Sequence, residues 1–241
     1  MHHDDLSPEQ AELLGLLLGD DAPDAGPIPR HPGGPAPLSY AQRQLYLVEQ
    51  LFPGTGSYLV GLGVRLRGAL DPAALERALA RLVERNSALR TRFLPGDGEP
   101  VQEVVPAWRL VLPRVDLRHL PEPERARVLA QVTAEELSRP FDLAEGRLLR
   151  AHLFALQTDE HVLLAVTHHV NSDAWSMAVF ARDLIALYDA LARGRPDPLP
   201  PAGTQMIDVA AWERRHRVVR PDDLAWWRDN LSGAPRLDLP T

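Results

Sequence analysis

The feature that most constrains the fold is an apolar run that passes through two histidines into a long helical pattern. Residues 162–166 are typical of a buried strand, and residues 172–191 have the apolar spacing of a helix. Between them lie His168 and His169, and Asp173 follows four residues after the second histidine. Because successive strand residues point to opposite faces, we expect one histidine to face the packed side of the sheet and the other to face a cleft. The pattern therefore places an acid–base group at a strand-to-helix boundary.

Composition excludes several classes of chemistry and of partner. The 241 residues suffice for one large domain or two small ones, and the absence of cysteine excludes disulfides, thiolate metal sites and cysteine nucleophiles. The net charge is −7, and all 26 basic residues are scattered arginines, so we expect no nucleic-acid partner. No apolar run reaches the roughly 18 residues of a membrane span, so we expect a cytoplasmic protein without membrane contact.

Metal binding and serine hydrolysis explain the paired histidines poorly. The sequence has no H-E-x-x-H motif, and adjacent histidines converge poorly on one ion. It also has no G-x-S-x-G turn. We therefore expect no metal and no directly bound cofactor. Taken alone, such a pair is more often structural than catalytic.

The N-terminal residues divide into a short helix and a linker. Residues 6–19 are typical of an amphipathic helix, with Ser7 as its N-cap and Pro8 at its first position. Residues 20–37 contain six prolines and three glycines, which predicts an extended, stiff linker with little helix or sheet of its own. We place the domain boundary there, so that residues 1–36 are the helix and linker and residues 37–241 are the main domain.

From residue 37 onward, helix and strand signals alternate. Ser39 caps a helix that runs to Gln50, and Asp71 caps another with Pro72 at its first position. Residues 148–156 and 161–167 are expected to pair as an antiparallel hairpin. This order predicts an α/β (α+β) sandwich with a mixed, largely antiparallel sheet packed by helices. The other expected helices are residues 123–137, 204–215 and 221–231, and the other expected strands are residues 58–66, 89–94, 100–105 and 110–115.

Four segments in order resemble the motifs of the condensation domains of nonribosomal peptide synthetases. Residues 167–176, T-H-H-V-N-S-D-A-W-S, are similar to the family's H-H-x-x-x-D-G-W-S, with Ala174 in place of glycine. Residues 37–46 resemble S-x-A-Q-x-R-L-W, and residues 85–93 resemble R-H-x-x-L-R-T-x-F. Near the end, Trp227 matches the tryptophan of Y-W-x-x-x-L. The resemblance extends over residues 37–241.

The resemblance implies a role for each matched residue. His169 would be the active-site histidine and His168 its buried structural neighbour. Asp173 would form a salt bridge that shapes the site, with Arg85 as the first choice of partner and Arg90 as the second. Such a bound pair is architectural, since losing one partner leaves a buried charge and costs about 3–5 kcal/mol.

Three further matched positions lie next to the aspartate. A methyl group at Ala174 is expected to narrow the site, or to strain its turn if that turn needs a positive φ. Trp175 and Ser176 would lie near the site.

The resemblance also implies the N-terminal lobe of a chloramphenicol-acetyltransferase-like fold. Its reaction joins an acyl or peptidyl thioester to an aminoacyl thioester, both held by phosphopantetheine on donor and acceptor carrier proteins. The family's tunnel lies between two lobes and this chain holds the first, with its end at the lobe junction. We therefore expect the C-terminal lobe as a partner, an apolar lobe-facing surface prone to self-association, and no turnover by this chain alone.

Two alternatives remain open at this point. One is a non-catalytic module that docks a carrier protein or another partner, and the other is the lobe of an epimerisation domain. A heterocyclisation domain is disfavoured, because it would carry aspartate in place of His168.

Overall fold

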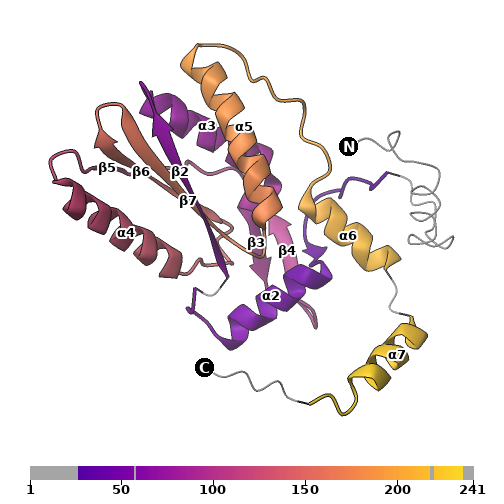
Figure 1. Cartoon of the computed structure of the whole chain (residues 1–241). Coiled ribbons are helices and arrows are strands. Elements are labelled where there is room, and N and C mark those ends of the chain that lie inside the picture. Colours follow the sequence, from indigo (N-terminus) through magenta and orange to yellow (C-terminus); the bar gives the residue numbers. More distant parts are fainter. Residues whose placement is uncertain (1–26, 57, 218–219, 236–241) are drawn as a thin grey trace, which may run out of the picture.

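The computed structural model describes residues 27–56, 58–217 and 220–235, in which helices and strands alternate (Figure 1). The helix expected over residues 6–19 lies outside this range. The strands are β1 (Ala36–Pro37), β2 (Leu59–Arg67), β3 (Thr91–Leu94), β4 (Val101–Val104), β5 (Arg114–Asp116), β6 (Leu149–Gln157) and β7 (Glu160–His168). The helices are α2 (Tyr40–Leu51), α3 (Pro72–Arg85), α4 (Glu122–Ser138), α5 (Ala174–Ala192), α6 (Met206–His216) and α7 (Pro221–Leu231), with a 3₁₀ turn at Ser87–Arg90.

The strands form two sheets. The larger sheet has the order β2-β7-β6-β5, and the smaller has the order β1-β4-β3. Every pairing is antiparallel except that of β5 with β6, which is parallel. The expected mixed, largely antiparallel α/β architecture is therefore confirmed, as is the hairpin of β6 and β7.

Strand β7 lies inside the larger sheet, and both of its faces are covered. Leu163 and Ala165 belong to a core that they share with α3 and α5. Leu164 and Val166 point the other way, into a core with side chains from α2 and α4. Figure 1 shows α3 and α5 on one face of this sheet and α4 on the other. Burial on both faces explains why the run is continuously apolar rather than alternating, and each fully buried leucine contributes about 1.5–3 kcal/mol.

Helix starts follow the local signals in the sequence. The Ser39 side chain accepts the N–H of Gln42, while the Gln42 side chain accepts the N–H of Ser39, which makes a complete capping box. Asp71 accepts the N–H groups of Ala73 and Ala74 at the start of α3. These short-range bonds satisfy donors that a helix start leaves unpaired, so the sequence locates them without tertiary information.

Two expected strands differ from the structure, and the linker ends in a two-residue strand. Within the linker, Ala36–Pro37 pairs with Gln102 and Val101 as strand β1. Residues 87–90 form a 3₁₀ turn, so β3 is shorter than residues 89–94. Residues 110–113 lie outside any strand although Leu110 and Leu112 are buried in the α3–α5 core. The strand at Ala36–Pro37 depends on a partner strand far along the chain. Leu110 and Leu112 contribute to the core through buried side chains instead of through strand pairing.

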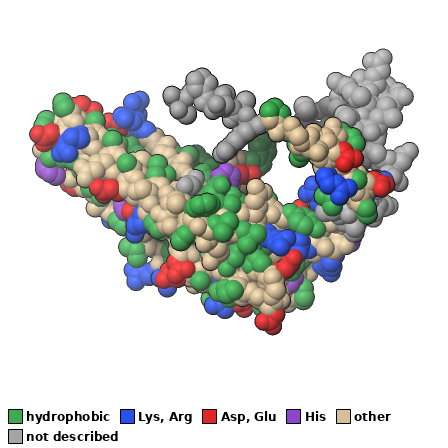
Figure 2. Space-filling view, turned by 90° about the horizontal axis from the view of Figure 1, so that it is seen from below, with side chains coloured by type: hydrophobic (Ala, Val, Ile, Leu, Met, Phe, Trp, Pro, Cys, Tyr) green, Lys and Arg blue, Asp and Glu red, His purple; other side chains and the backbone are tan. Residues whose placement is uncertain are grey.

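The last helix of the described chain is less buried than the helix before it. In α6, Ile207, Ala210 and Ala211 are buried, whereas α7 has no buried residue. Hydrophobic side chains gather on the face that Figure 2 shows from below, the side on which α2 lies in Figure 1. None of the helices that the structure describes is both long and apolar enough to cross a membrane. The large exposed hydrophobic side chains are Leu47, Leu51, Phe52, Val111, Trp175, Ile185, Leu224, Trp226, Trp227 and Leu231.

Candidate functional site at the end of strand β7

The two histidines at the end of β7 lie in opposite environments. His168 is the last strand residue and is 2% exposed. By the alternation of β7 it shares the face of Leu164 and Val166, which is the side of α2 and α4. His169 is exposed, and its backbone N–H donates to the carbonyl of Tyr58 at 2.7 Å. Among the residues that the structure describes, the His169 ring makes no hydrogen bond, so both ring nitrogens are available to a substrate.

The buried His168 ring is held by its own backbone. Its Nδ1 accepts the N–H of Val170 at 3.0 Å, which closes the turn that follows the strand. Burial lowers the pKa of His168, and the nearby Glu49 only partly offsets that effect. His168 is therefore neutral near pH 7 and cannot act as a permanent cation in this core.

A polar network stabilises the turn that presents His169. Thr167 Oγ1 donates to Asn171 Oδ1 at 2.9 Å, and Asn171 Nδ2 donates to the carbonyl of Ala88 at 3.1 Å. Ser172 Oγ contributes a bond to the carbonyl of His168 at 3.2 Å. The network ties the end of β7 to the 3₁₀ turn, so the position of His169 depends on segments about 80 residues apart in the sequence.

Asp173 is the N-cap of α5 and not the partner of an arginine. Its Oδ1 accepts the backbone N–H of Ser176 at 2.7 Å and the Ser176 hydroxyl at 2.6 Å. These two bonds lower the pKa of Asp173, and the nearby His169 lowers it further. Within the described residues it forms no ion pair with Arg85 or Arg90, so the expected salt bridge was wrong. The physical reason is local, because the unpaired backbone N–H of Ser176, three residues after Asp173 at the start of the helix, donates to the Asp173 carboxylate.

Arg85 and Arg90 have other partners. Arg85 Nε lies 3.9 Å from Oδ2 of Asp183, a residue of α5 that is 5% exposed. Arg90 donates to the carbonyls of Val105 and Glu84. An ion pair between the end of α3 and α5 therefore exists, but its aspartate is Asp183, which lies ten positions after Asp173.

A cavity of about 270 Å³ borders the same turn. Asn171, Ser172 and Ser176 contribute polar groups to its wall. Trp175 also lines the cavity and is 81% exposed. The rest of the lining is Asn86, Ala88, Leu89, Met177, Val179, Phe180, Asp183 and Met206. His169 itself does not line this cavity, and the lining residues nearest to it in the sequence are Asn171 and Ser172.

Ala174 does not strain the backbone. It is exposed and is the first residue of α5. Among the residues that the structure describes, no residue other than glycine has a positive φ. The expectation of a strained turn was therefore wrong, and the added methyl group acts only through the space that it occupies.

Two contributors to this site escaped the sequence analysis, Glu49 and Asp183. Glu49 follows the buried Gln42 and Tyr46 at helical spacing, which is a signal that the sequence contains. Asp183 lies among apolar residues of α5, and the apolar spacing of this helix did not indicate that the Asp183 side chain is buried. In the described part of the chain, no cluster of three or more histidine, aspartate or glutamate side chains could hold a metal ion.

The cap assignment makes a quantitative prediction for Asp173. Asp173→Ala should lower the free energy of unfolding by about 1 kcal/mol, the usual loss for an N-cap, and Asp173→Asn should retain most of it. Asp183→Ala removes a buried carboxylate that Arg85 and Arg182 both approach, so it should cost more than Asp173→Ala. Urea denaturation of the three variants measures this order. A larger loss for Asp173→Ala than for Asp183→Ala would contradict the assignment.

The same assignment has a pH dependence. Because the folded-state pKa of Asp173 lies below its ordinary value, the cap contributes fully above about pH 4. The contribution is lost as the pH falls through the lowered folded-state pKa. The stability difference between the wild type and Asp173→Ala should therefore shrink in acid.

Comparison with solved structures first identifies the fold of this chain. A starter condensation domain of rhizomide synthetase superposes with a TM-score of 0.71 at 23% identity, over 83% of this chain and 48% of that chain. The X-domain in a complex with OxyB from teicoplanin biosynthesis gives a TM-score of 0.74 at 32% identity, over 88% of this chain and 46% of that one. The fold is thus the chloramphenicol-acetyltransferase-like fold of condensation domains.

The sequence comparisons then give the family. The condensation-domain profile matches residues 34–241. A linear gramicidin synthase protein of Brevibacillus parabrevis is 39% identical over 233 residues, which is 95% of this chain and 3% of the synthase protein. The chain belongs to the condensation-domain family of nonribosomal peptide synthetases. It spans 3% of that synthase protein and about half of the two solved chains.

Proposed function

We propose that residues 37–241 form the N-terminal lobe of a condensation domain that makes an amide bond. The donor is an acyl or peptidyl thioester and the acceptor is an aminoacyl thioester. The observation that carries the proposal is the exposed His169 ring, presented by a buried strand and a hydrogen-bonded turn beside Asp173. Family membership supports the same reaction class.

In this reaction the acceptor amine attacks the thioester carbonyl. A C–N bond forms, the C–S bond breaks, and the donor's thiol leaves with a proton. Histidine is the side chain best suited to exchange a proton near neutral pH. His169 would accept the amine proton or hold the amine in line, and a proton transfer of this kind is worth about 10²–10⁴-fold in rate. Asp173 would keep the start of α5, and with it Trp175 and Ser176, in place beside the substrate.

Carrier proteins are the proposed partners, because the reacting thioesters are expected on their phosphopantetheine groups. The C-terminal lobe is proposed as the second wall of the site, and the cytoplasm as its location. The cavity of about 270 Å³ next to Ser176 would receive part of one substrate. Its largely apolar lining favours an apolar group over a charged one.

A second candidate function is partner docking without turnover. It is favoured by the similarity to the X-domain, which was solved in a complex with OxyB. Ala174 in place of the motif glycine is compatible with this alternative. The exposed hydrophobic side chains of α2 and α7 would then serve as contact surface.

The test is an amide-formation assay on the intact condensation domain. A donor carrier protein is loaded with an acyl group and an acceptor carrier protein with an amino acid, and the acceptor-bound product is weighed by mass spectrometry. Transfer of the acyl group to the acceptor supports the proposal. Inversion of the acceptor's or donor's α-carbon without transfer, which chiral chromatography of the released amino acid detects, would indicate epimerisation, and carrier binding without either change would indicate docking.

A further inference from the structure

The buried His168 ring exists in one defined protonation state. Its Nδ1 accepts the Val170 N–H at 3.0 Å, and a ring nitrogen that accepts an N–H carries no proton. In the neutral ring the proton is therefore on Nε2. This Nε2 is buried and has no hydrogen-bond partner among the residues that the structure describes.

The acidic oxygen nearest to this donor belongs to Glu49 of α2. Oε2 of Glu49 lies 3.7 Å from Nε2, and the Glu49 side chain is only 11% exposed. Gln42, Tyr46 and Glu49 are spaced by four and three residues, so they share the face of α2 that turns toward the core. A movement of about 0.5 Å or more would turn the approach into a hydrogen bond.

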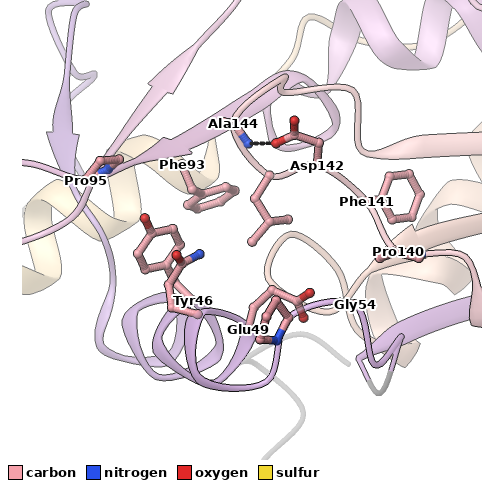
Figure 3. Close-up of a pocket in the computed structure, with 12 residues that line it drawn as sticks. Tyr46, Glu49, Gly54, Phe93, Pro95, Pro140, Phe141, Asp142 and Ala144 are labelled. Carbon is pink, nitrogen blue, oxygen red and sulfur yellow. Dashed lines mark hydrogen bonds between the residues drawn. The ribbon is translucent and has the colours of Figure 1, made fainter.

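Glu49 also borders a cavity of about 580 Å³. Figure 3 shows Tyr46 and Glu49 projecting from α2 toward this space, with Phe93, Phe141 and Pro140 around it. The Glu49 side chain therefore keeps a small exposed fraction while its Oε2 approaches the His168 ring. Burying a carboxylate entirely would cost more than this arrangement.

We propose that Glu49 is a positioning residue, whose carboxylate holds His168 in the Nε2–H tautomer so that Nδ1 can fix the turn carrying His169. The imidazole acts as a bridge between α2 and the backbone of Val170. Because His169 lies between His168 and Val170, the bridge restrains the backbone on both sides of it. The residue touches no reacting atom and acts through His168.

The experiment is performed on this chain with ¹⁵N-labelled histidine. The imidazole spectrum of His168 should show a protonated Nε2 and an unprotonated Nδ1 at neutral pH. In Glu49→Leu the buried Nε2–H loses the carboxylate that approaches it to 3.7 Å, so the ring should change tautomer or orientation. Hydrogen exchange at the Val170 amide should then accelerate by about fivefold or more, the effect of losing one net hydrogen bond.

Two variants serve as controls. Glu49→Gln keeps an acceptor oxygen and should retain the tautomer and the protection of Val170. Gln50→Leu changes the neighbouring residue of α2 that lines the same cavity and should leave both signals unchanged. An Nδ1–H tautomer in the wild type would overturn the proposal without any variant, even if Glu49→Leu failed to fold. Unchanged His168 and Val170 signals in a folded Glu49→Leu would overturn it as well.

The catalytic consequence rests on the proposed function. In the intact domain, Glu49→Leu should lower kcat for amide formation with little change in KM, and Glu49→Gln should restore it. The loss could reach about 100-fold, the effect of misplacing a reacting group by about 1 Å. If the tautomer shifts as expected but neither the wild type nor any variant forms an amide, the positioning role stands and the proposed reaction fails.

Discussion

Replacing His169 by alanine in the intact condensation domain is expected to lower the rate of amide formation by about 10²–10⁴-fold. The reason is geometric as well as chemical. His169 is the exposed member of the pair, and its ring makes no hydrogen bond among the described residues, so it can exchange a proton with the acceptor amine. Product formation on the acceptor carrier protein under single-turnover conditions measures the effect.

The same substitution should leave the fold almost unchanged. His169 is exposed, and its backbone N–H to Tyr58 remains, so the free energy of unfolding should change by less than about 0.5 kcal/mol. His119→Ala, another exposed histidine beyond strand β5, is the matched control and should keep full activity. A loss of less than threefold for His169→Ala would refute its catalytic role.

This chain alone is expected to show no turnover that exceeds the uncatalysed reaction. Under the proposed function, the C-terminal lobe supplies the second wall of the site, and the chain tested alone would lack that wall. Effective molarities of about 10⁵–10⁸ M depend on that orientation, and a site open on one side should lose nearly all of the advantage. The assay is run with the chain alone and again with the remaining half of the domain supplied.

Addition of the second half should restore amide formation, and His169→Ala should abolish the restored activity. Turnover by the chain alone that His169→Ala removes would contradict the expectation. Without the second half, we expect exposed side chains such as Leu51, Phe52 and Trp226 to favour self-association, and sedimentation velocity at rising concentration tests this expectation.

Local chemistry made part of the fold readable from the sequence. Ser39 and Asp71 begin helices because their side-chain oxygens satisfy free N–H groups within three residues. Gly194, with a φ of +64°, follows the end of α5, a position at which glycine adopts the left-handed backbone without strain. The hairpin of β6 and β7 was also readable, because a short turn brings its two strands together.

Contacts between distant segments were not readable in the same way. Leu110 and Leu112 are apolar enough for a strand, yet they fill a core without joining a sheet. The Asp173 side chain bonds to Ser176 three residues away, while Arg85 pairs with Asp183 across the α3–α5 interface. The family resemblance assigned a partner to Asp173, whereas the packing of the helices decided which aspartate Arg85 reaches.

The sequence by itself determined the order of the elements, the helix starts, the α/β class and the pair of histidines at a strand end. These depend on periodicity and on bonds that span a few residues. The tertiary structure alone decided that Glu49 faces His168 and that Asn171 bonds to the turn at Ala88. The physical reason is that such contacts join residues 83 to 119 positions apart, and only the packing of α2 and the 3₁₀ turn against β7 brings them within reach.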